Sequence, residues 1–330
     1  MNPLTTTLKT LAAAATLAAS VGMVTTPAAA QGASDTEALV YSRETEVQGV
    51  NIFYRESGEE FKGDRPTVIL LHGFPTSSHM FRDLIPVVGT YAHVIAPDYP
   101  GYGLSDDPSV DEFEYTFDNL SDIVEEVIDR EGVDEYVLYL MDYGAPVGYR
   151  IAARNPDKVE GLIVQNGNAY VEGLPDSFWG PIAKDWEAKS DETREPLRGL
   201  LTIEATKWQY TTGTRDPDAI SPDNYLAIQP KLDRPGNQEI QLALFRDYGT
   251  NPPLYPSWQA YFREHQPPTL ITWGKNDPIF PAEGAIPYLR DLENVELHLL
   301  NTGHFALEED GELIAQLIRR WYDREVSDID

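Results

Sequence analysis

A continuous apolar run, Tyr136-Val137-Leu138-Tyr139-Leu140-Met141, ends abruptly at Asp142-Tyr143-Gly144-Ala145. Such a run is typical of a strand that is buried on both faces of a parallel sheet. Pro146 follows, and proline is tolerated in the first turn of a helix because the N–H it lacks would have no partner there. The segment therefore predicts a strand that turns sharply into a helix and displays Asp142 at the turn.

The same alternation of strand and helix extends outward from this turn. Short apolar runs predict two antiparallel strands at residues 38–41 and 50–54, and buried parallel strands at 67–71, 94–96, 162–164, 269–273 and 295–300. Between about Gly173 and Ser257 the strand runs are replaced by helical stretches rich in Trp, Tyr and Pro. We predict an α/β fold with a mostly parallel eight-stranded sheet, formed by residues 36–172 and 258–326, and a helical cap inserted at 173–257.

Polar and glycine-rich motifs follow several of these strands. His72-Gly73-Phe74-Pro75 follows the third strand, and its turn can bring the Phe74 N–H opposite the Tyr143 N–H. Asp277 ends the seventh strand, and His304 follows the eighth. Open α/β sheets place their sites at the carboxyl ends of strands, so Asp142, Asp277 and His304 are expected to meet there. Glu172, just past the sixth strand, is the competing candidate for the acid.

The chain resembles the α/β-hydrolase superfamily over roughly residues 46–322. The order nucleophile, acid, histidine is the order of that superfamily, and its sharp strand-to-helix turn usually displays a serine. With aspartate at this position, the chain resembles the branch that contains epoxide hydrolases and haloalkane dehalogenases. The resemblance implies Asp142 as nucleophile, Asp277 and His304 as its partners, and the N–H groups of Phe74 and Tyr143 as an oxyanion hole.

The aspartate indicates the type of reaction. A serine that attacks a saturated carbon would leave an ether, which water cannot easily remove. A carboxylate leaves an ester, whose carbonyl carbon water can attack. Asp142 therefore favours displacement at an sp³ carbon of a small apolar electrophile, with His304 activating water to hydrolyse the ester.

Two activities of this branch differ in what receives the leaving group. Epoxide hydrolases use a pair of cap tyrosines, and the resemblance assigns that role to Tyr210 and Tyr248. Haloalkane dehalogenases need N–H donors for a halide, and Tyr143 and Phe74 present none at the nearest positions. Leu140 and the Pro75–Ser78 segment nevertheless resemble the dehalogenases, and a donor could come from the cap, from Trp179, Trp186 or Trp208. Epoxide hydrolysis is the leading hypothesis, dehalogenation the alternative, and a ligand-binding protein without catalysis a third.

The charge balance restricts the class of partner. The chain carries 54 acidic and 25 basic side chains, a formal net charge of −29. Such a surface repels nucleic acid and anionic membranes, so neither is expected as a partner. The chain has no cysteine, which excludes disulfides and thiolate metal sites. No ligand spacing indicates a metal and no glycine loop indicates a dinucleotide, so no cofactor is expected.

Residues 1–30 resemble a secretory signal peptide. Lys9 precedes an apolar run at 11–24, and Ala28-Ala29-Ala30 offers a small-residue cleavage site before Gln31. A helix of that run, at about 1.5 Å per residue, is too short to cross a hydrocarbon core about 30 Å thick. We therefore expect cleavage near Gln31 and a mature protein that is secreted or periplasmic.

Overall fold

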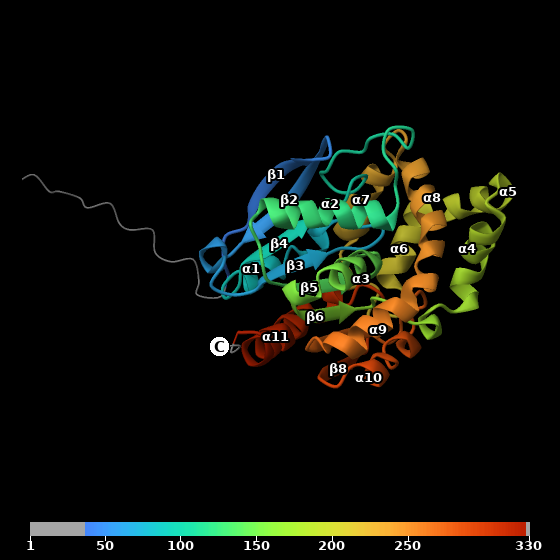
Figure 1. The fold of residues 1–330 in the computed structure, drawn as a ribbon. Coiled ribbons are helices and arrows are strands. Elements are labelled where there is room, and N and C mark those ends of the chain that lie inside the picture. Colours follow the sequence, from blue (N-terminus) through green and yellow to red (C-terminus); the bar gives the residue numbers. More distant parts are fainter. Residues whose placement is uncertain (1–36, 328–330) are drawn as a thin grey trace, which may run out of the picture. The chain divides into compact units, whose positions relative to one another are not determined.

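The computed structural model describes residues 37–327, so the predicted signal peptide lies outside the described residues. An eight-stranded sheet has the order β1-β2-β4-β3-β5-β6-β7-β8 (Figure 1). Pairing is antiparallel for β1 with β2 and for β2 with β4, and parallel for all other neighbours. This confirms the predicted fold class. The strands are β1 Tyr41–Val47, β2 Val50–Ser57, β3 Thr67–Leu71, β4 Val94–Pro97, β5 Tyr136–Met141, β6 Val159–Gln165, β7 Thr269–Gly274 and β8 Val295–Leu300.

The first strand lies further along the chain than predicted. β1 begins at Tyr41 rather than ending there, and residues 42–46 are polar and largely solvent-accessible. It is held by backbone pairing to β2, from Tyr41 opposite Glu56 to Val47 opposite Val50. An edge strand of this kind needs no apolar face of its own, so its sequence carries no alternating pattern.

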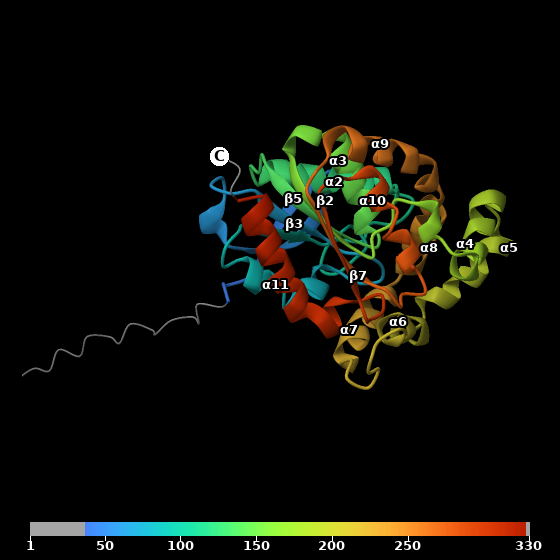
Figure 2. The same cartoon turned by 90° about the horizontal axis from the view of Figure 1, so that it is seen from below.

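Helices cover both faces of the sheet. On one face α2 (Phe117–Arg130) packs on α3 (Gly144–Arg154), which packs on α9 (Tyr255–His265), and on the other α1 (Ile85–Val88) packs on α11 (Leu307–Glu325). Figure 2 shows α11 on the side of the strands away from α3 and α9. The alternation of strand and helix also predicts a helix near residues 282–292, between the last two strands. The structure instead has a 3-10 turn at Ala282–Gly284 followed by the single turn α10 (Tyr288–Asp291). Pro287 lies within the predicted span, and proline disrupts a helix interior.

The chain between β6 and β7 is helical. Figures 1 and 2 both place α4, α6, α7 and α8 on one side of the described fold, and in Figure 1 the arrow of β6 points toward that side. Buried Arg150 of α3 donates to Asn251 Oδ1 at 2.8 Å and so fixes the end of this insertion to the core. The insertion comprises α4 Asp176–Ala188, α5 Asp191–Arg194, α6 Ile203–Thr211, α7 Pro222–Leu232 and α8 Asn237–Asp247.

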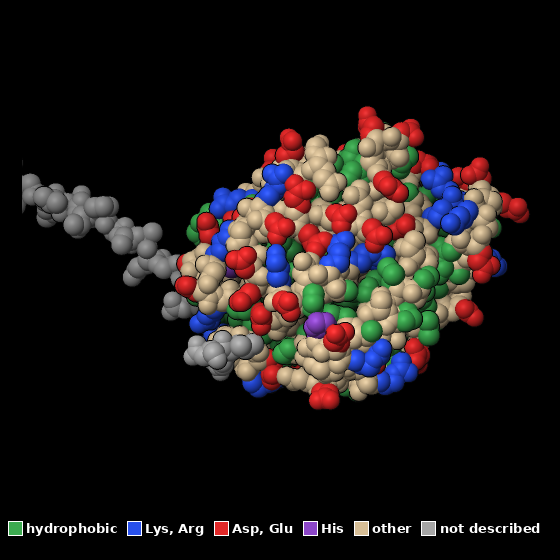
Figure 3. Space-filling view, viewed as in Figure 1, with side chains coloured by type: hydrophobic (Ala, Val, Ile, Leu, Met, Phe, Trp, Pro, Cys, Tyr) green, Lys and Arg blue, Asp and Glu red, His purple; other side chains and the backbone are tan. Residues whose placement is uncertain are grey.

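The surface reflects the acidic composition. Figure 3 shows Asp and Glu side chains spread over the visible face with Lys and Arg between them, not gathered in one patch. Within residues 37–327, none of the helices combines the length and the apolar character that crossing a bilayer requires.

Candidate active site

Asp142 occupies a strained turn between β5 and α3. Its φ is +51°, in the left-handed region, which costs a non-glycine residue about 1–2 kcal/mol. A side chain on Gly144 would overlap the carbonyl oxygen of Leu71, so only glycine lets α3 begin this close to β3. Strain of this kind persists where the surrounding packing enforces it, and it often marks a functional site. The turn holds the Asp142 carboxylate buried, with 5% of the residue exposed.

Two backbone donors meet on one oxygen of this carboxylate. The N–H of Phe74 donates to Asp142 Oδ1 at 2.7 Å, and the N–H of Tyr143 donates to the same atom at 2.6 Å. Gly73 makes this approach possible, because a Cβ at that position would overlap the Asp142 side chain. The structure thus brings the two predicted donors together and leaves Oδ2 outside their hydrogen bonds.

His304 lies beside Asp142 Oδ2, and the carboxylate of Asp277 orients its ring from the other side. Its Nδ1 is 2.7 Å from Asp277 Oδ2, and its Nε2 is 3.7 Å from Asp142 Oδ2. Because a carboxylate only accepts hydrogen bonds, Asp277 places the ring proton on Nδ1. Nε2 therefore carries a free lone pair, and it is buried without a hydrogen-bond partner among the described residues. This is the arrangement of a general base that awaits a water molecule.

Asn166 is a part of the site that the sequence reasoning missed. It follows β6, and its Nδ2 donates to Asp277 Oδ2 at 2.8 Å while its Oδ1 accepts from the Gly274 N–H at 2.9 Å. The Ile279 N–H satisfies the other Asp277 oxygen at 2.8 Å. The sequence feature that indicates Asn166 is its position directly after the carboxyl end of a buried strand. Glu172, the competing acid, instead pairs with Arg290 at 2.9 Å on a partly exposed turn.

The electrostatics of Asp142 and His304 are linked. Burial raises the pKa of Asp142 to about 6, although the His304 charge and the two backbone N–H groups lower it. Burial by itself would lower the pKa of His304, but the charge and hydrogen bond of Asp277 and the charge of Asp142 raise it above its ordinary value. Asp142 is therefore mainly ionised at neutral pH, and loss of its charge would lower the pKa of His304.

A narrow, mostly apolar cavity lies in front of Asp142. About 350 Å³ inside it is free of atoms, a volume that includes open solvent at its mouth, so the enclosed space in front of Asp142 is much smaller than that. Its polar groups are few, so water competes little with a bound apolar molecule. The lining residues are Phe74, Asp142, Tyr143, Phe178, Trp179, Ile182, Leu200, Gln209, Phe245 and Ile279.

The two predicted ring-opening tyrosines lie in different surroundings. The ring of Tyr248 packs beside those of Tyr143 and Trp179, and burial, the Tyr255 hydroxyl and the Asp142 charge raise its pKa. Tyr210 stacks on Phe305 with 4.0 Å between ring centroids. Neither residue belongs to the cavity lining, and of the two only Tyr248 has its pKa raised by the charge of Asp142.

The tryptophans of the insertion are engaged elsewhere. The indole N–H of Trp179 donates to the carbonyl of Ile279 at 2.9 Å, and that of Trp186 to the carbonyl of Phe245 at 2.8 Å. Trp208 stacks on Phe178 and is 38% exposed. The indole N–H groups of buried Trp179 and half-buried Trp186 are therefore not free to hold a halide in this structure.

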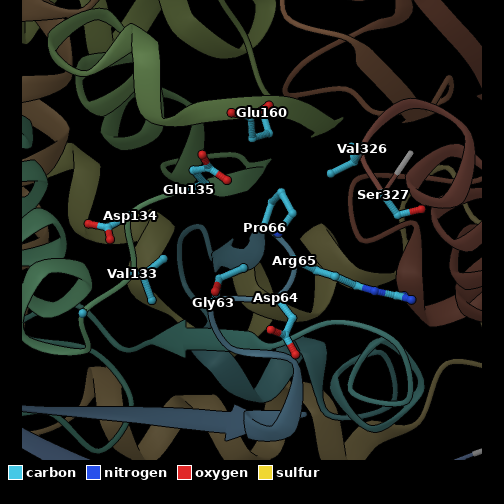
Figure 4. Close-up of a pocket in the computed structure, with 12 residues that line it drawn as sticks. Gly63, Asp64, Arg65, Pro66, Val133, Asp134, Glu135, Glu160, Val326 and Ser327 are labelled. Atoms are coloured by element: carbon cyan, nitrogen blue, oxygen red, sulfur yellow. The ribbon is translucent and has the colours of Figure 1, made fainter. Parts of the chain in front are cut away.

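A second pocket lies at the opposite edge of the sheet. Figure 4 shows the carboxylates of Asp134, Glu135 and Glu160 around it, near the amino ends of β5 and β6. Active sites of open α/β sheets form at the carboxyl ends instead, which favours the cavity at Asp142. Within residues 37–327, no group of three or more His, Asp or Glu side chains is arranged to hold a metal ion.

Comparisons with known proteins agree with this geometry. A family model described as the alpha/beta hydrolase fold matches residues 66–311. An uncharacterized hydrolase of Saccharomyces cerevisiae is 39% identical over 273 residues, which cover 82% of this chain and 92% of the yeast protein. Haloalkane dehalogenase 2 of Mycobacterium tuberculosis is 29% identical over 267 residues, covering 78% and 88%. The solved structure of the epoxide hydrolase CorEH superimposes with a TM-score of 0.69 at 20% identity, over 86% of this chain and 99% of that one, which shows the shared fold.

Proposed function

This chain belongs to the α/β-hydrolase family, and we propose that it is an epoxide hydrolase that works through an ester on Asp142. One observation carries the proposal: Asp142 Oδ1 is held by two backbone N–H groups, while Oδ2 lies free beside His304. A carboxylate held in this way has one oxygen available for attack and the other already in an oxyanion hole.

In the first half-reaction Asp142 Oδ2 attacks an epoxide carbon. The new bond joins Oδ2 to that carbon, the carbon–oxygen bond of the ring breaks, and its electron pair goes to the epoxide oxygen. The resulting alkoxide takes a proton from an acid, and the nearby phenol of Tyr248 is the proposed source. Esterification removes the charge of Asp142.

In the second half-reaction His304 Nε2 takes a proton from water, whose oxygen attacks the carbonyl carbon of the ester. The negative charge develops on Oδ1, where the N–H groups of Phe74 and Tyr143 already point. The bond between the carbonyl carbon and the ester oxygen then breaks, the departing oxygen takes the proton held on His304 Nε2, and a diol is released. The new carboxyl group of Asp142 gives its proton back to the Tyr248 phenolate, so all three groups return to their starting state. Because Asp142 is neutral as an ester, the pKa of His304 is lower at this stage than in the free enzyme, so Nε2 is unprotonated and can accept the proton of water.

Two observations favour an epoxide over an alkyl halide. An alkoxide must be protonated, and the Tyr248 ring packs beside that of Tyr143, the residue that follows Asp142. A halide only needs donors, and the indole N–H groups of Trp179 and Trp186 are taken by backbone carbonyls. The sequence similarity to a haloalkane dehalogenase favours dehalogenation as the second candidate, through the same ester.

Product analysis on a matched substrate pair tests the choice. Styrene oxide and (2-bromoethyl)benzene have similar apolar bulk and differ in the leaving atom. We expect diol from the oxide and little bromide from the halide, with no diol from the Asp142→Ala variant. Rapid bromide release with no diol would favour the dehalogenase instead.

A further inference from the structure

Two polar side-chain groups of the cavity, the Gln209 amide and the Tyr143 hydroxyl, are not used in the mechanism above. Gln209 lies on α6, lines the same cavity as Asp142, and is 4% exposed. Its side-chain amide has no hydrogen-bond partner within the part of the chain that the structure describes, and it is not fully enclosed, because the cavity reaches it. The other polar side-chain groups of the lining are the Asp142 carboxylate, the Tyr143 hydroxyl and the Trp179 N–H, which Ile279 already occupies.

An amide in this state is unfavourable unless something binds it. Burying a polar group without a hydrogen bond costs stability, whereas an apolar residue of similar shape would cost none. A leucine would also complete an apolar wall formed by Ile182, Leu200 and Phe245. The position therefore favours a ligand that supplies the missing partner.

The direction of the amide follows from the charge it faces. Asp142 is ionised at neutral pH, and its negative charge favours the NH₂ end of Gln209 pointing into the cavity over the carbonyl end. Negative charge leaves Asp142 during the attack and appears on the atom that departs from carbon. An N–H donor that faces this cavity stabilises that atom.

Helix geometry explains why Gln209 and not its neighbour faces the nucleophile. Successive residues of a helix point about 100° apart, so Gln209 and Tyr210 cannot face the same way. Gln209 faces the cavity, while Tyr210 stacks on Phe305.

We propose that the side-chain N–H of Gln209 binds the leaving atom of the substrate while Asp142 forms its ester. The proposal rests on the ester mechanism of the preceding subsection. Gln209 gives no proton; it donates a hydrogen bond to the epoxide oxygen, which Tyr248 protonates. Its contribution is confined to ester formation, because water attack moves no charge onto the departed atom.

Rapid-quench mass spectrometry of Asp142 esterification tests the proposal on the full chain. Gln209→Leu and Gln209→Glu are compared with Gln238→Leu, a control in the same insertion whose side chain contacts Arg198 and does not line the cavity. With styrene oxide we expect ester formation to slow by about 10²-fold in Gln209→Leu and further in Gln209→Glu. Ester hydrolysis and the Gln238→Leu control should match wild type.

The outcomes separate the two proposals. Equal ester formation in Gln209→Leu and wild type would overturn the role of Gln209 and leave the ester mechanism standing. If styrene oxide gives no ester but (2-bromoethyl)benzene does, and Gln209→Leu slows it, the epoxide assignment fails while Gln209 stands as a halide donor. No ester with either compound overturns both. Equal slowing of both half-reactions, or a lowered melting temperature in Gln209→Leu, would assign the residue a structural role and contradict the proposal.

Discussion

The carboxyl edge of the sheet and the helical insertion meet at one cavity but present their groups differently. The sheet edge presents Asp142, Asp277 and His304 next to strand ends, together with two backbone N–H groups. The insertion presents side chains from helices, and a rotation of one residue exchanges Gln209 for Tyr210. The position of a side chain at a strand end is fixed by the pairing of the sheet, whereas the direction of a side chain on a helix depends on how the helix is rotated. In the proposed mechanism the sheet edge therefore sets the reaction type, and the insertion sets the choice of leaving group.

The largest expected effect is at the nucleophile. Asp142→Asn should reduce epoxide turnover by more than about 10⁴-fold, since the backbone donors have no ester to act on without a nucleophile. The variant should be at least as stable as wild type. A raised carboxyl pKa means that the folded state disfavours ionisation, and this cost, which is fully present above about pH 6, is absent in asparagine. Turnover and thermal unfolding at pH 7.5 measure both effects, and a lower melting temperature would contradict the second.

Replacement of the base should separate the half-reactions. His304→Gln should form the Asp142 ester at nearly the wild-type rate and hydrolyse it on the order of 10²–10⁴-fold more slowly. Intact-protein mass spectrometry after mixing with styrene oxide should then show a stable adduct. A folded variant that forms no adduct would show that His304 is needed for ester formation. That result would contradict the assignment of His304 to ester hydrolysis alone.

A smaller effect is expected from the insertion. Tyr248→Phe should slow ester formation by about 10²-fold, because the proposed proton source is lost. Tyr210→Phe should have a smaller effect, since its ring lies on Phe305 and outside the cavity lining. Rapid-quench kinetics of both variants provide the comparison. If Tyr210→Phe slows ester formation more than Tyr248→Phe does, then Tyr210 and not Tyr248 acts on the substrate, which would contradict the proposed roles.

The smallest effect is a shift along the pH axis. The raised pKa of Asp142 predicts that ester formation falls about tenfold per pH unit below about pH 6, because only the carboxylate attacks. An unshifted aspartate would keep its activity to about pH 4. Single-turnover rates between pH 4.5 and 8 distinguish the two. A limb near pH 4 would mean that burial does not raise the pKa.

The comparison also explains how far the sequence could be interpreted. The apolar run before Asp142 predicts β5 because a strand buried on both faces needs that composition, and the structure confirms it. The motifs around Phe74, Asp277 and His304 were placed by strand ends alone, and the structure brings them to Asp142. β1 was misplaced because an edge strand can be polar.

Side chains on helices were harder to predict. Gln209 carries no motif, and its importance depends on how α6 is rotated against the cavity, which tertiary packing decides. The role of Asn166 was also hard to predict, because it depends on hydrogen bonds to Gly274 and Asp277 at the end of the neighbouring strand β7. The predicted export signal lies outside the described residues and stays a prediction; an amino terminus near Gln31 in mature protein from the source would support it.

The central claim, that hydrolysis passes through an ester on Asp142, is tested most directly by a single turnover in H₂¹⁸O with enzyme in excess over styrene oxide. Water attacks the carbonyl carbon of the ester, so the account predicts that ¹⁸O enters the Asp142 carboxylate and that the diol carries none. Peptide mass spectrometry of the segment around Asp142 and mass analysis of the diol give the two values. Label in the diol with none in the peptide would mean that water attacks the epoxide directly, and it would contradict the account.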